Sequence, residues 1–367
     1  MKKILFVTAF VPGRTGAGEN FSRQFINEIS ARNKVDLIYF KYQADANYVS
    51  ESGNVNVLRV FRNSFKIKFF NFLMFPVIFP LFSVRFNIKR LHFIKKTVKK
   101  NNYDLVIFDF SQTFLFSNFI SGVPVLLNCH DVIAQRYSRI YSGIFEPIVK
   151  LSEKFVLNNK NAQIFCLSEK DRVLLSDFYN LQAISTSIFL DKSVINSYPR
   201  QAGQYFVFFA NWNRPDNSEG LKWFLNNVYP GLAEHLKFKI IGSGLDPSVV
   251  SRIVSCPGIE YMGFISNPYP VISDAMALIS PLFTGAGIKV KVLESLACGT
   301  PVIGTKISME GVSDEYSRYL FPADDAVEFI QKVNNFSVDL EEKKGLKKLF
   351  LSSYRNNNIS DWVNREN

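Results

Sequence analysis

A short stretch near residue 290 reads as a strand, a loop, a helix and a second strand, and it constrains the fold more than any other part of the chain. Ala277 to Pro281 is apolar enough for a buried strand, and a loop with two glycines follows it. A short helix then leads to Gly299-Thr300-Pro301 and a second apolar strand, Val302 to Gly304. Buried apolar strands joined through a helix are typical of a parallel α/β sheet covered on both faces.

The loop and the helix carry groups suited to binding an anion beside a sugar. Gly285 and Gly287 lack side chains, so the loop can approach a ligand closely. Lys289 and Lys291 place two cations at the start of the helix, where free backbone N–H groups already favour negative charge. Glu294 follows one turn later and can accept hydrogen bonds from two sugar hydroxyls. These groups predict a nucleotide-sugar pocket; the alternative is an ordinary strand–loop–helix unit with solvated charges.

The pattern Gly-x-Lys-x-Lys-x-Leu-Glu-Ser-x-Ala-x-Gly-x-Pro-Val-Ile, from Gly287 to Ile303, resembles the donor site of GT-B-fold glycosyltransferases of the retaining family 4 type. In that family the glutamate at the position of Glu294 binds the donor ribose, and basic groups beside it hold the diphosphate. Many members have a second glutamate eight residues earlier that contacts the donor sugar, but Ala286 stands there. The chain therefore resembles the subgroup with a Gly-x-Lys/Arg-x-Lys pattern.

The resemblance implies an α/β protein of the GT-B type, with two Rossmann-like doubly wound parallel-sheet domains that face a cleft. The length of 367 residues also fits two domains better than one. We expect an acceptor domain over 1–190, a linker over 191–204, a donor domain over 205–350 and a C-terminal helix over 351–367 that packs back towards the first domain.

Alternating apolar strands and helix-length segments support this division. In the first half we expect strands at Ile4 to Phe10, Lys34 to Phe40, Val55 to Val60, Leu105 to Phe108, Val123 to Leu127 and Ala162 to Leu167. In the second half we expect strands at Tyr205 to Ala210, Phe238 to Ile241, Ile259 to Gly263, Ala277 to Ser280 and Val302 to Gly304.

Three further positions of the second half fall on loops that are similar to the family's donor loops. Arg214 lies in the first of these loops, and Gly244 and Phe264 lie in the next two. Many relatives pair an arginine at the first position with a lysine five residues later, but here that position is Glu219. We therefore expect Lys289 and Lys291 to supply the charge that neutralises the leaving diphosphate. Arg214 as a solvated loop residue remains the alternative.

Two features of the first half point to the same cleft. Gly16 and Gly18 belong to a glycine-bearing turn between the first strand and the first helix, which exposes backbone N–H groups to a ligand. The resemblance implies that this turn touches donor phosphate or acceptor; a plain flexible turn is the alternative. His130 directly follows a strand, and the family often has a histidine here near the bond that breaks. The alternative is a histidine bonded to a local backbone group.

The chain is basic, with a net charge of +11, and one region is both basic and rich in phenylalanine. No acidic residue lies between Ser52 and Tyr103. Phe69 to Phe82 is too short and too rich in proline to span a bilayer. We predict that residues 58–100 lie against an anionic membrane surface; a core helix with a solvated basic face is the alternative. The basic residues are Arg59, Arg62, Lys66, Lys68, Arg85, Lys89, Arg90, Lys95, Lys96, Lys99 and Lys100.

The remaining sequence features indicate which classes of partner and which cellular compartment to expect. No zinc-finger, helix-turn-helix or RNA-recognition pattern is present, so we expect no nucleic-acid partner. Four widely spaced cysteines predict buried reduced thiols in a cytoplasmic protein. The apolar N-terminus is short, lacks a cleavage site and is read as the first strand, not a signal peptide.

The sequence thus predicts a metal-independent, retaining glycosyltransferase that is peripherally bound to the inner face of the membrane. It moves a hexosyl-type unit from a nucleotide-sugar to a hydroxyl of a lipid-linked or cell-surface glycan, with His130, Lys289 and Lys291 as catalytic groups. No Asp-x-Asp motif follows a strand in the first half, so we expect neither a metal nor another cofactor. Two alternatives stay open: a sugar-nucleotide 2-epimerase of the same fold, and a non-catalytic glycosyltransferase-like subunit, which Ala286 motivates.

Overall fold

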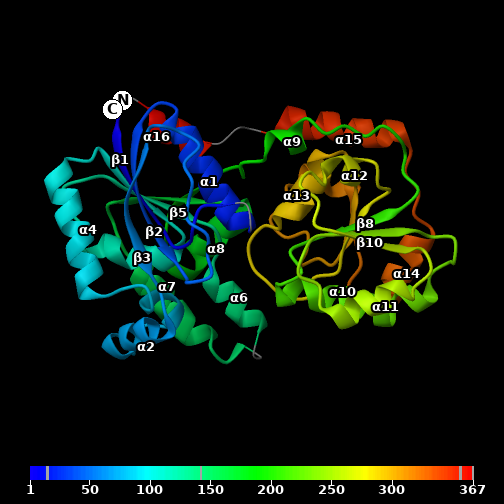
Figure 1. Cartoon of the computed structure of the whole chain (residues 1–367), viewed down its shortest axis with the longest axis horizontal. Coiled ribbons are helices and arrows are strands. Elements are labelled where there is room, and N and C mark those ends of the chain that lie inside the picture. The colour runs from blue at the N-terminus through cyan, green and yellow to red at the C-terminus, as the bar shows by residue number, and fades with distance from the viewer. Residues whose placement is uncertain (14–15, 141–142, 355–357, 366–367) are drawn as a thin grey trace. The chain divides into compact units, whose positions relative to one another are not determined.

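The computed structural model describes residues 1–13, 16–140, 143–354 and 358–365. They form two compact units, each built around its own parallel sheet (Figure 1). Unit 1 runs from Met1 to Phe189 and also takes in the last helix, whereas unit 2 begins at Leu190 and holds the rest of the second half. The fold class expected from the sequence, two doubly wound α/β domains, is confirmed.

Unit 1 contains a sheet of seven strands in the order β3-β2-β1-β4-β5-β6-β7, and every neighbouring pair is parallel. Ile4 of β1, for example, lies opposite Val35 of β2 on one side and Leu105 of β4 on the other. The strands are β1 (Lys3–Thr8), β2 (Lys34–Lys41), β3 (Val55–Arg62), β4 (Leu105–Asp109), β5 (Val125–Cys129), β6 (Ala162–Cys166) and β7 (Ala183–Ser185).

Helices join these strands and cover both faces of the sheet. The helices are α1 (Ala17–Ser30), α2 (Phe65–Met74), α3 (Pro80–Ser83), α4 (Ile88–Asn101), α5 (Ser111–Phe114), η1 (Leu115–Phe119), α6 (Ile133–Arg139), α7 (Glu146–Leu157), α8 (Glu169–Tyr179) and α16 (Asn358–Asn364). The last of them packs beside α1, as Figure 1 shows. Lys2 Nζ donates to the carbonyl of Val363 (3.0 Å), and the Trp362 ring lies 5.9 Å from that of Phe165 in β6. The C-terminal helix is therefore part of unit 1.

Unit 2 repeats the architecture with six parallel strands in the order β10-β9-β8-β11-β12-β13. The strands are β8 (Phe206–Phe209), β9 (Phe238–Ile241), β10 (Ile259–Gly263), β11 (Leu278–Ser280), β12 (Val302–Gly304) and β13 (Leu320–Pro322). The helices are α9 (Lys192–Ile195), α10 (Pro215–Asn227), η3 (Tyr229–Gly231), α11 (Pro247–Val254), α12 (Tyr269–Ser273), α13 (Val290–Ala297), η4 (Asp314–Tyr319), α14 (Ala326–Asn334) and α15 (Leu340–Ser353).

The sheets place the loops that matter for function. In a parallel sheet all strands end at one edge, and ligands of doubly wound folds bind there. In unit 1 this edge carries the loops after β1, β4 and β5, which are neighbours in the sheet. In unit 2 it carries the loops after β8, β9 and β11, which are also neighbours. Residues distant in sequence therefore meet at each edge.

Candidate active site

In unit 2, two helices begin side by side at the carboxyl edge of the sheet. The α10 helix follows β8, and α13 follows β11, the neighbouring strand. Gly220 lets α10 pack closely against the end of β11, because a Cβ at this position would lie 2.1 Å from the carbonyl oxygen of Pro281. The N-termini of both helices, with their free N–H groups, thus share one small region, which is a favourable place for an anion.

The predicted lysines lie in this region but make different contacts. Lys291 Nζ donates to Asn217 Oδ1 of α10 at 3.0 Å, which links the two helix starts. Lys289 Nζ instead donates to the carbonyl of Gly287 at 2.6 Å, within its own loop. That loop needs glycine, since Gly285 (φ +114°) and Gly287 (φ +66°) have the left-handed backbone that other residues rarely adopt.

Arg214 lies at the start of α10 and is paired with an acidic residue that the sequence analysis did not consider. Its Nη2 lies 3.3 Å from Asp216 Oδ2, and its side chain is 57% exposed. Asp216 Oδ1 also accepts a hydrogen bond from Thr284 Oγ1 at 3.0 Å, which ties α10 to the loop after β11. Arg214 is therefore exposed beside Lys291, with Asp216 balancing part of the positive charge.

Glu294 lies one turn into α13 and is nearly buried, with 9% of its surface exposed. Its Oε1 accepts a hydrogen bond from the hydroxyl of Tyr269 at 3.0 Å. Tyr269 begins α12, so a residue from another helix fixes the orientation of this carboxylate. The sequence pattern indicated Glu294 but not the tyrosine that holds it.

Burial shifts the ionisation of both groups in opposite ways. It raises the pKa of Glu294 to about 7. Burial, with the charges of Arg214 and Lys289, lowers the pKa of Lys291 to about 7. A charged carboxylate is the better acceptor for ribose hydroxyls, and a charged ammonium is the better partner for a diphosphate. The charged carboxylate of Glu294 and the charged ammonium of Lys291 coexist best near neutral pH.

We therefore expect the affinity for a nucleotide-sugar to peak near pH 7 and to fall on both sides. Below the peak Glu294 takes up a proton, and above it Lys291 loses one. Isothermal titration calorimetry across pH with an uncharged-sugar nucleotide diphosphate checks this, because the diphosphate diester does not itself titrate in the range. In Glu294→Gln only the alkaline decline should remain, and in Lys291→Met only the acidic one. A flat profile in the wild-type protein would contradict these assignments.

The other donor residues predicted in unit 2 lie in neighbouring loops. Gly244 follows β9 with φ +91°, and a Cβ there would lie 2.4 Å from the side chain of Asn213. Phe264 follows β10 and is 75% exposed. Gly244 therefore packs against the loop that carries Arg214, while Phe264 presents a ring to solvent.

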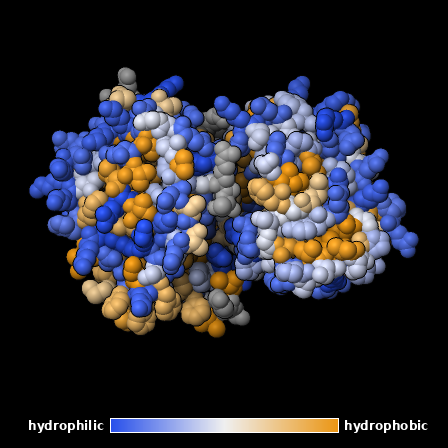
Figure 2. Space-filling model, viewed as in Figure 1, coloured by the Kyte–Doolittle hydropathy of each residue, from blue (hydrophilic) through white to orange (hydrophobic). Residues whose placement is uncertain are grey.

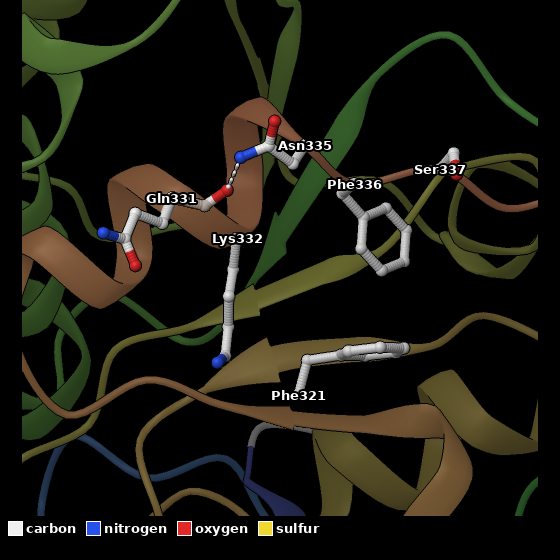
Figure 3. Close-up of a pocket in the computed structure, with 6 residues that line it drawn as sticks. All are labelled: Phe321, Gln331, Lys332, Asn335, Phe336 and Ser337. Carbon is white, nitrogen blue, oxygen red and sulfur yellow. Dashed lines mark hydrogen bonds between the residues drawn. The ribbon is translucent and has the colours of Figure 1, made fainter.

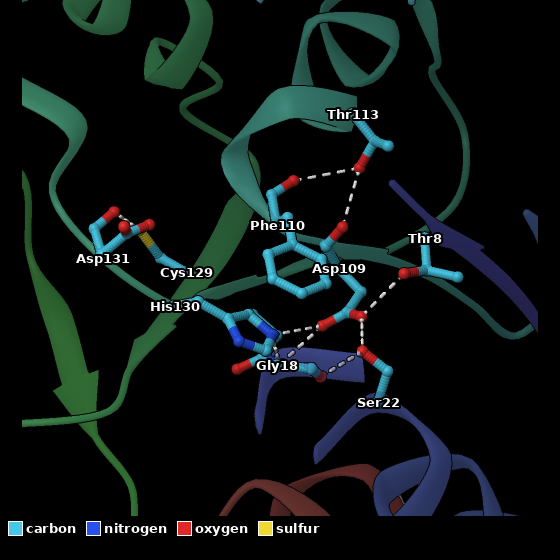
Figure 4. Close-up of polar contacts among 10 residues, drawn as sticks. Thr8, Gly18, Ser22, Asp109, Phe110, Thr113, Cys129, His130 and Asp131 are labelled. Atoms are coloured by element: carbon cyan, nitrogen blue, oxygen red, sulfur yellow. Dashed lines mark hydrogen bonds and ion pairs between the residues drawn. The ribbon is translucent and has the colours of Figure 1, made fainter. Parts of the chain in front are cut away.

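In unit 1, His130 lies against a fully buried carboxylate that the sequence analysis missed. Figure 4 shows Asp109, the last residue of β4, at the centre of the polar contacts. Its Oδ1 contacts His130 Nε2 at 2.8 Å and accepts from Asn128 Nδ2 at 2.7 Å. Its Oδ2 accepts from Thr8 Oγ1 at 2.9 Å and contacts the hydroxyl of Ser22. All of its acceptor sites are thus occupied, which satisfies a buried charge.

This arrangement selects which nitrogen of His130 is available. Nε2 lies 2.8 Å from Asp109 Oδ1 and 3.0 Å from Asn128 Nδ2. Because the carboxylate is the stronger partner, we infer the tautomer that carries its proton on Nε2. Nδ1 is then left as an acceptor, and it faces Gly18, where a Cβ would lie 3.5 Å away. The imidazole is also stacked on Phe110 (3.7 Å between ring centroids) and meets the edge of Phe21. The histidine is held by side chains, so the alternative of a histidine bonded to a local backbone group is wrong.

The glycines of the first turn have separate roles. At Gly18 a Cβ would lie 2.9 Å from the ring of Phe110, so a side chain would displace the group that stacks on His130. Gly16 is the residue before α1, and the side chain of Glu19 folds over it. Arg14 and Thr15 of the same predicted turn lie outside the described residues. Gly18 thus belongs to the histidine cluster.

Unit 1 also bears an exposed apolar surface, which we call the apolar patch. Figure 2 shows apolar side chains gathered at the end of unit 1 where α2 lies. In α2 the polar Asn71 is buried, while Phe65, Phe69 and Phe70 are 83%, 52% and 67% exposed. The patch consists of Phe65, Phe69, Phe70, Leu73, Met74 and Val77 with Ile144, Phe145, Ile148, Leu151 and Phe155. The second group lies on and just before α7, a helix that the sequence analysis did not include.

Two basic residues that the sequence placed at this surface are buried instead. Arg85 and Arg90 are only 3% and 6% exposed. Arg90 packs over the rings of Phe40 and Phe61 and donates to the carbonyl of Arg62. The prediction that these two arginines belong to the basic surface is therefore wrong. The sequence shows the charge of a residue but not the direction of its side chain. No helix within the described ranges is long and apolar enough to cross a membrane.

A shallow pocket lies elsewhere on unit 2. It has a volume of about 320 Å³ and is formed by β13, α14 and the turn after that helix (Figure 3). The lining residues are Phe321, Gln331, Lys332, Asn335, Phe336 and Ser337, none of which is a predicted site residue. Among residues 1–13, 16–140, 143–354 and 358–365, no group of three or more histidine, cysteine or acidic side chains is arranged to hold a metal.

Comparisons with known proteins agree with this fold of two parallel-sheet α/β units. Residues 203–339 match the family described as Glycosyl transferases group 1. A Klebsiella pneumoniae protein named "Uncharacterized 44.6 kDa protein in cps region" is 24% identical over 280 residues, which cover 71% of this chain and 70% of that protein.

Solved structures show the same fold over nearly the whole chain. Sucrose-phosphate synthase from Thermosynechococcus elongatus has a TM-score of 0.70 at 15% identity, with 96% of this chain and 94% of that chain covered. WaaG, a glycosyltransferase involved in lipopolysaccharide biosynthesis, has a TM-score of 0.67 at 10% identity and 98% coverage of both chains. Anabaena HepE in complex with UDP has a TM-score of 0.66 at 12% identity and 95% coverage of both. These likenesses show the GT-B fold, and the match to a glycosyltransferase family covers residues 203–339.

Proposed function

We propose that the protein transfers a sugar, with retention of configuration, from a nucleotide-sugar to a hydroxyl of a lipid-linked glycan precursor. The observation that carries the proposal is the meeting of Lys291, Arg214 and two helix N-termini, with the carboxylate of Glu294 one turn further along α13. Cations and N–H groups suit the diphosphate, and the carboxylate suits the ribose. Negative charge grows on the diphosphate as the sugar leaves, so the same groups that bind the donor also favour its cleavage. No metal is required for this role.

Nucleotide binding by Glu294 tests the donor assignment. We expect Glu294→Ala to weaken binding of UDP about 10- to 100-fold, since a hydrogen bond to a charged group contributes ~1.5–3 kcal/mol. UDP is the first nucleotide to try because Anabaena HepE was crystallised with it. Calorimetry measures the change, and Glu260→Gln, an exposed acid of the same unit, is the matched control. Equal affinity in Glu294→Ala and the wild type would remove Glu294 from the ribose site.

In unit 1 we assign His130 to the acceptor hydroxyl. With Nε2 bound to Asp109, its Nδ1 can accept the proton of that hydroxyl, and the rings of Phe110 and Phe21 hold the imidazole in place. Asp109 acts through His130 and is a positioning residue. Gly18 keeps the space in front of Nδ1 open.

The apolar patch is assigned to the membrane interface, together with the exposed lysines of 58–100. A helix with a buried asparagine and exposed phenylalanines gains by inserting its outer face into lipid. We expect Phe69→Ser with Phe70→Ser to weaken binding to anionic vesicles at least about tenfold, since burying one phenylalanine contributes ~1.5–3 kcal/mol. Both side chains are exposed, so the fold should be unaffected.

Vesicle co-sedimentation measures this change. Val254→Ser, which alters an exposed apolar residue of unit 2, is the control and should bind like the wild type. If the double variant also binds like the wild type, the patch does not contact the membrane.

A further inference from the structure

A buried positive charge in unit 1 has no negative partner. Arg85 follows α3 and is 3% exposed. Its Nε donates to the carbonyl of Ala9 at 3.1 Å, and its guanidinium lies 4.8 Å from the centre of the Phe10 ring. Within the described ranges no carboxylate pairs with it, and its terminal nitrogens donate no hydrogen bond. A buried charge without a counter-ion is costly, so such a group is expected to meet an anion in the working protein.

Arg90, the other buried arginine of this segment, shows what a purely structural role looks like. Its Nη1 donates to the carbonyl of Arg85 at 2.9 Å, and its Nη2 donates to the carbonyl of Arg62 and to Asn63 Oδ1. Its donors are therefore used by backbone and side-chain oxygens of the fold. Arg85 differs because only its Nε is used in this way.

Arg85 lies beside the histidine cluster. Ala9, which it contacts, directly follows Thr8, whose hydroxyl donates to Asp109. Phe10, over which the guanidinium lies, meets the ring of Phe110 at 4.9 Å, and Phe110 stacks on His130. Two aromatic rings thus separate the guanidinium from the imidazole at the same edge of the sheet.

On its other side Arg85 adjoins the helix of the apolar patch. Asn71 of α2 donates to the carbonyl of Val84, the residue before Arg85, at 2.7 Å. Lys68, also on α2, lies 4.3 Å from the centre of the Tyr42 ring. Arg85 therefore stands between the exposed apolar helix and His130.

We propose that Arg85 binds the phosphate group through which the acceptor sugar is attached to its lipid. The proposal rests on the proposed function and adds the chemical class of the acceptor's anchor. A guanidinium binds phosphate oxygens through two parallel N–H groups and keeps its charge when buried. The order along unit 1 is apolar patch, Arg85, His130, which matches the order lipid, phosphate, sugar hydroxyl in such an acceptor.

Vesicles with different anionic groups test the proposal on the full chain. One set of phosphatidylcholine vesicles contains a long-chain alkyl phosphate monoester, and a second contains phosphatidylglycerol at equal charge. We expect the wild type to bind the first set about 10-fold more tightly, a preference typical of a charge-assisted bidentate contact. Arg85→Gln should lose this preference but keep its binding to phosphatidylglycerol. Arg32→Gln, which changes an exposed arginine of unit 1 outside the 58–100 segment, should keep both.

The remaining outcomes decide against the proposal. A preference for alkyl phosphate that persists in Arg85→Gln would remove the site. If inorganic phosphate slows hydrogen exchange around Arg85 as much as the alkyl phosphate vesicles do, the lipid is irrelevant. Should Arg85→Gln not fold, hydrogen exchange of wild-type residues 84–86 must slow with alkyl phosphate vesicles and not with phosphatidylglycerol. UDP binding by the same variants reports on unit 2 separately, so failure of the donor assignment is distinguishable.

Discussion

Lys291→Met is expected to lower the turnover number about 100- to 1000-fold, because losing one preorganised donor to a developing oxyanion costs ~2.7–4 kcal/mol. We expect this large effect because the ammonium of Lys291 lies between the two helix starts, where Asn217 holds it. Lys289→Ala should have a smaller effect, since the ammonium of Lys289 is engaged with its own loop. Methionine keeps much of the volume of the lysine stem, so the packing around α13 should persist.

The measurement is the initial rate of sugar transfer or of nucleotide release. Lys306→Met is the matched control, an exposed lysine of unit 2 that pairs with Asp324. We expect the control to retain wild-type turnover and both proteins to melt at similar temperatures. Wild-type turnover in both Lys291→Met and Lys289→Ala would refute the charge assignment.

Asp109→Asn is the second change with a large expected effect. It should lower turnover about 100-fold or more, the usual contribution of a positioned general base. An amide leaves the size of the side chain unchanged but no longer favours the His130 tautomer with its proton on Nε2. The hydroxyls of Thr8 and Ser22 and the amide of Asn128 lose a charged acceptor as well, so some loss of stability is also expected.

A double-mutant cycle separates positioning from stability. If Asp109 acts through His130, then Asp109→Asn should have little further effect on turnover once His130→Ala is present. The pH profile of the single variant should also change, which loss of stability alone would not produce. Additive losses in the cycle would mean that Asp109 supports the fold and not the histidine.

The fold could be predicted from the sequence because its strands are apolar runs separated by helix-length segments. Phe238–Ile241, Ile259–Gly263 and Val302–Gly304 begin and end where the pattern predicted. The strands missed were β7 and β13, each of three residues at an edge of its sheet. Edge strands bury less surface, so their sequences lack the apolar run that reveals the inner strands.

The site was predictable only in part. Spacing placed Lys291 and Glu294 on one helix, because both belong to a single local motif. It did not show Tyr269 or Asn217, which contact them from other helices. Asp109 lies 21 residues before His130, and only the pairing of β4 with β5 brings the two together. The available sequence signal for this pair was Asp109 itself, an acidic residue at the end of a buried central strand.

The sequence was the poorest guide to which charged side chains are buried. The run of basic residues over 58–100 predicted one basic, membrane-facing surface, yet Arg85 and Arg90 point into unit 1. Conversely, Phe65, Phe69 and Phe70 of α2 are exposed, whereas the alternative of a core helix required them to be buried. Helical spacing alone does not tell which face of such a helix meets the protein.

Transfer of a labelled sugar tests the central claim most directly. The full-length protein is incubated with a panel of nucleotide-sugars, with and without a membrane lipid extract, and label is measured in the lipid fraction. We predict transfer from one donor that needs the extract and is lost in Lys291→Met. Conversion of the donor without any acceptor, or nucleotide binding with no transfer across the panel, would contradict the account and favour an epimerase or a non-catalytic subunit, respectively.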